Sequence, residues 1–287
     1  MMMEKYIQAG KILRQVKEEV KDKVKMGVKM LDIAEFVEGR IRELGASPAF
    51  PCNISINRDA AHCTPSKNDK RIFKEGDLIK IDIGAHIDGY IADMAFTVDL
   101  GDHQDLVRAA EEALKNAIEI IEAGVNTAEI GAIIEKTIKD FGFNPIYNLT
   151  GHGLKRYVAH AEPTIFNYSI KKGVELKEGM VIAIEPFVTN GVGKVVERSE
   201  VEIFSLINLK NVRMKIARDF IKEIFEKYRT LPFAKRWLKN PREIILAKLV
   251  KENVLRSYPV LTEVSGGLVS QAEHTVIVKE DGAEIIT

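Results

Sequence analysis

The sequence predicts an α+β fold in which helices pack outside an antiparallel sheet. Two stretches about a hundred residues apart resemble each other, residues 74–82 and 177–185. Each is a turn containing glycine, followed by an alternating strand that ends on a carboxylate. Pairs of segments with 3.6-residue apolar spacing precede these strands in both halves. A duplicated unit of two helices and a strand pair fits an α+β architecture.

The helices and strands follow from apolar periodicity and from stop signals. Helices are predicted over residues 6–25, 30–44, 106–123 and 127–141. Asp32 and Thr127 lie near plausible N-caps, and Gly45 and Gly142 are expected to end the second helix of each pair. Strands are predicted over residues 78–85, 90–98, 181–188, 195–204 and 268–278.

One basic segment interrupts this repeat. Residues 1–287 are predicted to form a single domain of two half-repeats, about 1–103 and 104–287, with a helical insertion at residues 210–256. Helices are expected within the insertion at residues 216–228 and 242–252. The insertion carries 14 Lys and Arg but five Asp and Glu, a charge of +9 that leaves the remainder at −9. A solvated, heat-stable helical face accounts for this charge as well as a binding role does.

Composition excludes several classes of protein. The 287 residues are 46% apolar and carry no net charge, which excludes disorder as the main state. No run of about 18 apolar residues could span a membrane. The N-terminal segment lacks the apolar core of a signal peptide, so we expect a cytoplasmic protein that does not bind membranes. Cys52 and Cys63 are expected to be thiols.

A predicted hairpin brings two aspartates together. The dipeptide at residues 88–89, Asp-Gly, is a strong turn signal that places Asp93 opposite Gly84 and Asp82 opposite Ala95. Because side chains alternate between faces, Asp82 and Asp93 become diagonal neighbours on one surface. Two such carboxylates repel each other unless a cation or a proton lies between them. The hairpin alone is equally compatible with two solvated charges.

The repeat extends this cluster. Glu185 occupies in the second half the position that Asp82 occupies in the first, and related strands would bring both toward one point. Glu273 interrupts an apolar pattern in what we predict to be the last strand. His152 lies between two glycines in a predicted loop, where the backbone can approach closely. Four carboxylates and one histidine form an oxygen-rich set that suits a pair of divalent ions.

At this point the sequence resembles the methionine aminopeptidases, and specifically their type 2 branch. The resemblance covers essentially the whole chain, and the basic insertion matches the segment that separates type 2 from type 1. It implies a duplicated pita-bread fold and a cytosolic hydrolase that removes the initiator methionine when the second residue is small. The residues that match the five metal ligands of the family, in order and spacing, are Asp82, Asp93, His152, Glu185 and Glu273.

The resemblance also implies a role for each ligand. Asp93 and Glu273 would bridge two divalent ions, which could be Co, Mn, Fe or Zn. Asp82 would complete one metal site, and His152 with Glu185 the other. A metal-bound water would be the nucleophile and Glu185 its general base.

The substrate residues are assigned by the same resemblance. His62 and His160 match the two active-site histidines that contact the scissile peptide and stabilise the tetrahedral intermediate. Phe50, Pro51 and Cys63, with His62, are expected to line the methionine pocket. Cys63 stands where the family commonly has an aromatic residue.

Two other functions remain as alternatives. A proline-specific peptidase of the same fold usually carries an additional N-terminal domain, which this sequence is not expected to have. A binding protein on the same scaffold characteristically lacks metal ligands, and all five are present here.

We expect the partners to be peptides and nascent proteins with N-terminal methionine. No feature of the sequence demands more than a monomer. The basic insertion suggests weak contact with ribosomal RNA, because Lys235, Arg236 and Lys239 surround Trp237 and combine cations with an aromatic ring.

Overall fold

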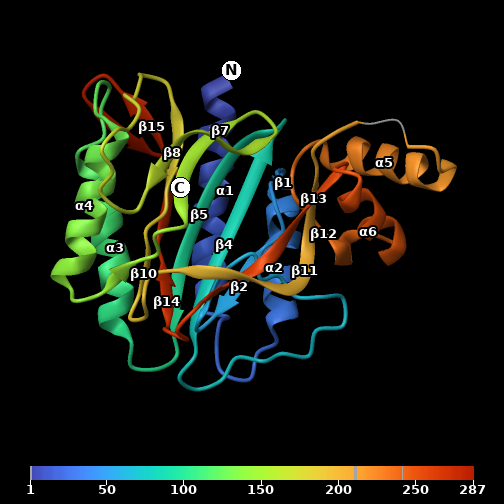
Figure 1. Cartoon of the computed structure of the whole chain (residues 1–287), viewed down its shortest axis with the longest axis horizontal. Coiled ribbons are helices and arrows are strands. Elements are labelled where there is room, and N and C mark those ends of the chain that lie inside the picture. The colour runs from blue at the N-terminus through green and yellow to red at the C-terminus, as the bar shows by residue number, and fades with distance from the viewer. Residues whose placement is uncertain (1, 210–211, 241) are drawn as a thin grey trace.

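The fold is a large curved sheet with helix pairs packed against it (Figure 1). The structure is a computed structural model that describes residues 2–209, 212–240 and 242–287. The predicted α+β class is confirmed. No helix within these ranges is both long enough and apolar enough to cross a membrane.

The largest sheet in the described residues carries the predicted hairpin near its centre. Its strands, in spatial order, are β1 (Ser47–Pro48), β4 (Leu78–Ile87), β5 (Tyr90–Asp99), β15 (Glu273–Lys279), β9 (Val181–Ile184), β7 (Thr150–Lys155) and β8 (Val158–Phe166). In addition, β2 (Asn53–Ile56) pairs with β4, and β16 (Gly282–Ile285) pairs with β15. Every pairing in this sheet is antiparallel.

Two smaller sheets complete the β-structure of the described chain. One contains β14 (Val269–Gln271), β10 (Phe187–Thr189) and β6 (Asn144–Pro145). The other contains β12 (Phe233–Ala234), β11 (Val195–Leu206), β13 (Leu255–Glu263) and β3 (Asp59–Ala61).

The helices occur where the apolar spacing predicts them. They are α1 (Met2–Lys21), α2 (Met30–Glu43), α3 (Gln104–Glu119), α4 (Thr127–Asp140), α5 (Lys215–Tyr228), a short 3₁₀ helix η1 (Lys235–Trp237) and α6 (Glu243–Lys251). The apolar faces of α1 and α2 contribute to one hydrophobic cluster, and those of α3 and α4 to a second. A third cluster joins α5 and α6 to β11 and β12. Residues 210, 211 and 241 of the expected insertion lie outside the described residues.

The glycines predicted to end two of the helices are confirmed, and the residues predicted near N-caps lie in the first turn of their helices. Gly45 and Gly142 follow the C-caps of α2 and α4 with φ of 88° and 82°, a conformation that glycine adopts without strain. The cap of α4 is Asn126, one residue before Thr127, in a capping box with Glu129. Asp32 lies in the first turn of α2 rather than at its cap.

Two predicted strands are each divided in the structure. The strand predicted over residues 181–188 breaks between β9 and β10, where Pro186 offers no backbone N–H to a ladder. The one predicted over residues 268–278 breaks at Ala272, whose amide donates to Pro186 O at 3.4 Å. Since β9 pairs with β15 and β10 with β14, the two segments leave the large sheet at the same place and continue as neighbours in a smaller sheet. Glu185 and Glu273 lie at this transition between the two sheets.

The structure also contains strands that the periodicity did not predict. His152 lies on β7 rather than in a loop, and β16 follows β15, so Glu273 is not on the last strand. The glycines on either side of His152 weakened the strand signal. They are required because a Cβ on Gly151 would meet Ala183 O at 2.5 Å, and one on Gly153 would meet Glu162 O at 2.2 Å.

Candidate metal centre

A cavity of about 300 Å³ lies where β4, β5, β7, β9 and β15 come together. The five residues expected to bind metal and both expected histidines line this cavity: Asp82, Asp93, His152, Glu185, Glu273, His62 and His160. The structure thus brings together side chains that lie up to about two hundred residues apart in the sequence.

The predicted hairpin register is confirmed. β4 and β5 pair Gly84 with Asp93 and Asp82 with Ala95, as the turn signal requires. Both residues at the tip, Asp88 and Gly89, have positive φ, of 51° and 86°. Asp82 and Asp93 therefore share a face of the hairpin, and both point into the cavity.

The second half of the chain supplies further ligand atoms close to Asp93. His152 Nε2 lies 3.9 Å from Asp93 Oδ2 and 3.4 Å from Glu185 Oε1. Ligand atoms of Asp93, His152 and Glu273 all lie within 4.8 Å of one another. This spacing allows three buried groups to hold one cation.

The surroundings of the four cavity carboxylates disfavour their charged forms. Burial, and then repulsion from one another, raises the pKa of Asp93, Glu185 and Glu273 well above the usual range. Burial also raises the pKa of Asp82 to about 7, against a hydrogen bond that lowers it. Burial holds the pKa of His152 well below its usual range, which leaves the imidazole neutral. A bound divalent cation would lower the pKa of these four carboxylates again and keep them charged.

Two further observations fit a metal ion at this place. Asp82 Oδ1 and Asp93 Oδ1 are buried and have no hydrogen-bond partner. His152 Nδ1 lies 3.3 Å from Gly153 O, a carbonyl that can only accept, so Nδ1 carries the proton. The lone pair of His152 Nε2 then faces Asp93 and Glu185. A lone pair and carboxylates directed at one point suit a bound cation.

Sequence reasoning missed the polar residues behind the ligands. Asn53 Nδ2 donates to Asp82 Oδ2 at 3.3 Å, and Gln271 Nε2 donates to Glu185 Oε2 at 3.4 Å. Thr275 Oγ1 accepts from Asp93 N at 2.8 Å. Gln271 and Thr275 lie two residues before and after Glu273, so alternation along the strand could have identified them.

The expected substrate residues divide into two groups. Phe50, His62 and His160 line the cavity. His62 Nδ1 donates to Pro259 O at 3.3 Å, and burial lowers the pKa of His62 to about 4, so its Nε2 is a free acceptor. The rings of His152 and His160 contact each other with centroids 4.4 Å apart.

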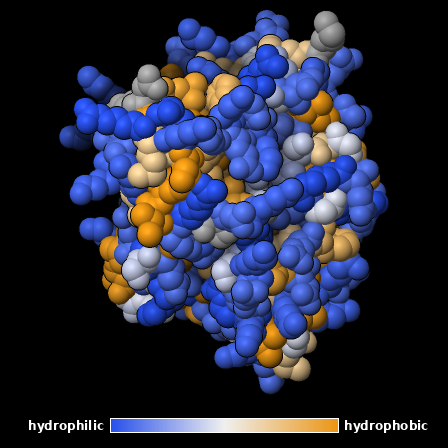
Figure 2. Space-filling model, turned by 90° about the vertical axis from the view of Figure 1, so that its right-hand side faces the viewer, coloured by the Kyte–Doolittle hydropathy of each residue, from blue (hydrophilic) through white to orange (hydrophobic). Residues whose placement is uncertain are grey.

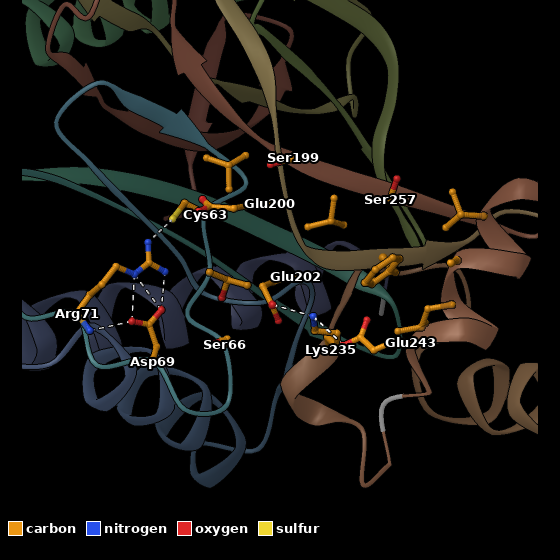
Figure 3. Close-up of a pocket in the computed structure, with 17 residues that line it drawn as sticks. Cys63, Ser66, Asp69, Arg71, Ser199, Glu200, Glu202, Lys235, Glu243 and Ser257 are labelled. Carbon is orange, nitrogen blue, oxygen red and sulfur yellow. Dashed lines mark hydrogen bonds and ion pairs between the residues drawn. The ribbon is translucent and has the colours of Figure 1, made fainter.

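Pro51 and Cys63 are not among the described residues that line this cavity. His62 follows the end of β3 and has a positive φ of 60°, and its side chain and that of Cys63 line different cavities. The Cys63 thiol instead accepts from Arg71 Nη1 at 3.6 Å and lines a second cavity of about 800 Å³. This second cavity, shown in Figure 3, lies on the other face of β11. Cys63 therefore does not line the cavity that contains His62, and its place in the methionine pocket stays a prediction.

Comparison with known proteins adds an independent result. The model of metallopeptidase family M24 matches residues 4–280. The methionine aminopeptidase of Archaeoglobus fulgidus is 65% identical over 284 residues, which cover 99% of this chain and 98% of the relative. That of Thermococcus onnurineus is 53% identical over 291 residues, with 99% of each chain covered.

A solved structure agrees with these relatives. The crystal structure of methionine aminopeptidase from Thermotoga maritima matches with a TM-score of 0.75 at 26% identity, covering 100% of this chain and 96% of that one. The curved antiparallel sheet with outer helices is thus the pita-bread fold. Because the family model and the relatives span nearly the whole sequence, the chain belongs to the methionine aminopeptidases of family M24, metallopeptidase hydrolases that act on peptides with N-terminal methionine.

Proposed function

We propose that this protein is a type 2 methionine aminopeptidase that removes the initiator methionine from nascent chains with a small second residue. The observation that carries the proposal is the convergence of four carboxylates and a neutral histidine in one cavity beside His62 and His160. The basic segment between β11 and β13 supports the type 2 subclass. We place the enzyme in the cytoplasm, as a monomer, on the sequence grounds given above.

We propose that the cavity holds two divalent ions. Asp93 and Glu273, buried to 4% and 2% exposure, would bridge them. Asp82 would complete one site, and His152 with Glu185 the other. When bound, the ions supply Lewis acidity and lower the pKa of water to near neutrality. Oxygen-rich ligands with one imidazole accept Co, Mn, Fe or Zn.

The protein's own groups would move the protons and orient the substrate. Glu185 would accept a proton from the attacking water and deliver it to the leaving amine, while Gln271 holds its second oxygen. The free acceptor, His62 Nε2, suits the N–H of the scissile peptide. His160, beside His152, would stabilise the tetrahedral intermediate.

The cavity walls support the proposed specificity. Phe50 would contact the methionine side chain. Ile203, Tyr258 and Leu261 line the same cavity, and in this proposal they would leave room only for a small second residue. We propose that residues 1–287 act as one catalytic domain with half-repeats of about 1–103 and 104–287 and an insertion at residues 210–256.

The proposal is tested by chelation and metal readdition. The chelated enzyme should not cleave Met-Ala-Ser, and each of the four metals should be tried for recovery by measuring released methionine. Met-Leu-Ser, with its larger second residue, should be cleaved at least about tenfold more slowly. Cleavage of a peptide with proline in second position but without methionine, and none of Met-Ala-Ser, would instead indicate a proline-specific peptidase.

We also propose a weak contact between the insertion and ribosomal RNA, through Lys239 of the expected cations and through other exposed lysines of the insertion. Lys235 is paired with Glu202 at 2.9 Å and Glu243 at 3.1 Å, and Arg236 is buried. The buried Arg236 side chain is thus not accessible to RNA, and Lys235 is engaged by two carboxylates. The face that carries α5 and α6 is largely hydrophilic (Figure 2). Its exposed cations include Lys215, Lys239 and Lys251.

A further inference from the structure

Arg236 is a charged residue of the insertion whose side chain is almost fully buried. Its side chain is 3% exposed, and that of its partner Glu38, on α2, is 4% exposed. Arg236 Nη2 pairs with Glu38 Oε1, while Trp237 Nε1 donates to Glu38 Oε2 at 2.7 Å. Two neighbouring insertion residues thus hold one carboxylate that lies 198 residues earlier in the chain.

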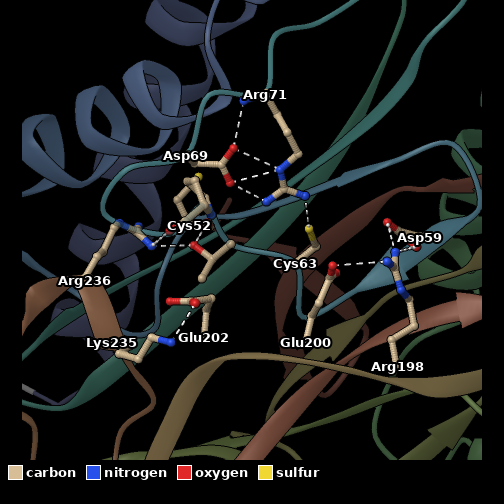
Figure 4. A network of polar contacts seen from close by, with 12 residues as sticks. Cys52, Asp59, Cys63, Asp69, Arg71, Arg198, Glu200, Glu202, Lys235 and Arg236 are labelled. Atoms are coloured by element: carbon tan, nitrogen blue, oxygen red, sulfur yellow. Dashed lines mark hydrogen bonds and ion pairs between the residues drawn. The ribbon is translucent and has the colours of Figure 1, made fainter. Parts of the chain in front are cut away.

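The second amino group of Arg236 holds the loop that follows β3. Its Nη1 donates to Thr64 Oγ1 at 2.7 Å and to Pro65 O at 3.1 Å. The Thr64 hydroxyl donates in turn to Cys52 O at 2.7 Å, and Cys52 N donates to Glu38 Oε1 at 3.1 Å. Figure 4 shows Arg236 and Cys52 in this network. We call Arg236, Glu38, Trp237 and Thr64 the arginine node.

The arginine node touches the two segments that form one wall of the active-site cavity. Phe50 and Asn53, on either side of Cys52, both line the cavity. His62, two residues before Thr64, lines it as well. Ile54 N donates to Cys63 O at 2.6 Å and ties the two segments together. The residues that contact the node are therefore only one or two positions away from residues that line the cavity.

Geometry explains the choice of arginine better than stability does. A buried ion pair gains little net stability, because desolvation of both charges offsets their attraction. The planar guanidinium, however, has donors in a fixed fork and can bind Glu38, Thr64 and Pro65 at once. A lysine has a single nitrogen on a flexible stem and cannot reproduce this arrangement.

We propose that Arg236 is a positioning residue that sets the wall of the methionine pocket by fixing Phe50 and His62 through the arginine node. The inference rests on the proposed function. It makes the insertion a structural part of the active site, since Pro232 of the same segment also lines the cavity. Arg236 itself does not line the cavity.

The test compares R236K with K239M in the metal-loaded enzyme. R236K keeps a buried cation beside Glu38, so it should fold, whereas R236M would leave that carboxylate unpaired. K239M removes an exposed cation three residues away in the same segment and is the matched control. The readouts are KM and kcat for Met-Ala-Ser, the ratio of kcat/KM for Met-Ala-Ser over Leu-Ala-Ser, and metal affinity by calorimetry.

R236K should raise KM and lower the Met-over-Leu ratio by about tenfold each, with a smaller change in kcat. Metal affinity should stay within about twofold, because no ligand is altered. The emission of Trp237, the only tryptophan, should shift because its hydrogen-bond partner moves. K239M should change none of these readouts.

Two results would overturn the inference. One is a folded R236K with shifted Trp237 emission but with KM and selectivity equal to those of K239M. The other is a loss of metal affinity as large as the loss in kcat/KM, which would place the effect at the metal centre. Absence of any cleavage by the metal-loaded wild type would instead refute the proposed function and, with it, the inference.

Discussion

The four cavity carboxylates share one physical problem, which is how to remain charged when water is excluded. Each has its pKa raised by burial, and Asp93, Glu185 and Glu273 also by their neighbours. The neutral His152 does not offset the repulsion between the carboxylates, because its Nε2 presents a lone pair and no positive charge. Cations bound between these groups would stabilise all of them together, so the response of each residue to mutation should reveal how many cations it contacts.

Removing the charge of Glu185 should separate binding from chemistry. E185Q keeps the size of the side chain but cannot accept a proton, so we expect kcat to fall at least about a hundredfold with the fold preserved. Circular dichroism and steady-state kinetics on Met-Ala-Ser, at saturating metal, provide the measurement. Near wild-type turnover in this variant would assign the proton transfer to another group.

The ligands should also differ in their effect on metal binding. A bridging carboxylate neutralises two cations, whereas Asp82 would serve one. D93N and E273Q should therefore weaken metal binding more than D82N does. Calorimetric titration of the three purified variants gives the order, and equal losses at all three positions would contradict the bridging arrangement.

At the scale of the element, the hairpin of β4 and β5 does more than place Asp82 and Asp93. A Cβ on Gly84 would lie 2.2 Å from Phe50 Cε1, so this glycine makes room for the ring that lines the cavity. At its tip, the Gly89 amide donates to His86 Nδ1 at 3.0 Å. The hairpin thus has a steric requirement at Gly84 and, two residues nearer its tip, a titratable acceptor at His86.

The steric requirement predicts a selective defect in G84A. The new methyl group would displace the Phe50 ring, so KM for Met-Ala-Ser should rise about tenfold. Gly39 is a matched control, because a Cβ there meets nothing within 4 Å and lies on helix α2. G39A should leave KM unchanged. A G84A enzyme with wild-type KM would show that Phe50 does not shape the pocket.

The titratable acceptor predicts a pH dependence of stability. Burial lowers the pKa of His86 to about 4 from its usual 6.5, against the attraction of Asp88. The unfolded chain therefore binds this proton more tightly between these values, and stability is lost as pH falls from about 6.5 to 4. We expect His86 to account for about 1–2 kcal/mol of this loss, reduced by its partial exposure. In H86Q the midpoint of urea unfolding should depend less on pH over this range than it does in the wild type. An equally steep pH dependence in both proteins would contradict the assignment to His86.

At the scale of the whole molecule, charge is separated between two regions. Residues 210–256 carry +9 and the remainder −9. In the field of a polyanion such a molecule would be oriented with the insertion toward the negative surface. Lys235 and Arg236 contribute to the charge but face inward, where they join the insertion to β11 and α2. Only the exposed cations remain for an external partner.

This separation predicts salt-dependent binding to ribosomes. A K215A/K239A/K251A triple variant should lose most of its co-sedimentation, and wild-type binding should fall about tenfold or more between 50 and 200 mM salt. A triple variant of exposed lysines elsewhere, K11A/K115A/K177A, should bind as the wild type does. Binding that neither salt nor the insertion variant reduces would leave the insertion with its structural role.

The sequence by itself determined the features that depend on local order. Apolar periodicity and a single Asp-Gly turn suffice for the α+β class and for the register that pairs Asp82 with Ala95. The repeat predicted that Glu185 would join them. These inferences succeed because side-chain alternation and turn geometry are properties of neighbouring residues.

Only the tertiary structure decided where distant segments meet. The break at Pro186 has a local cause, but its alignment with the break at Ala272 involves a hydrogen bond between the two segments, which no periodicity in either segment contains. Nothing in the sequence around Arg236 distinguishes it from an exposed arginine. It is buried because Glu38, on α2, lies against it. Side-chain burial and pairing are set by packing between segments far apart in the chain, which local sequence patterns do not record.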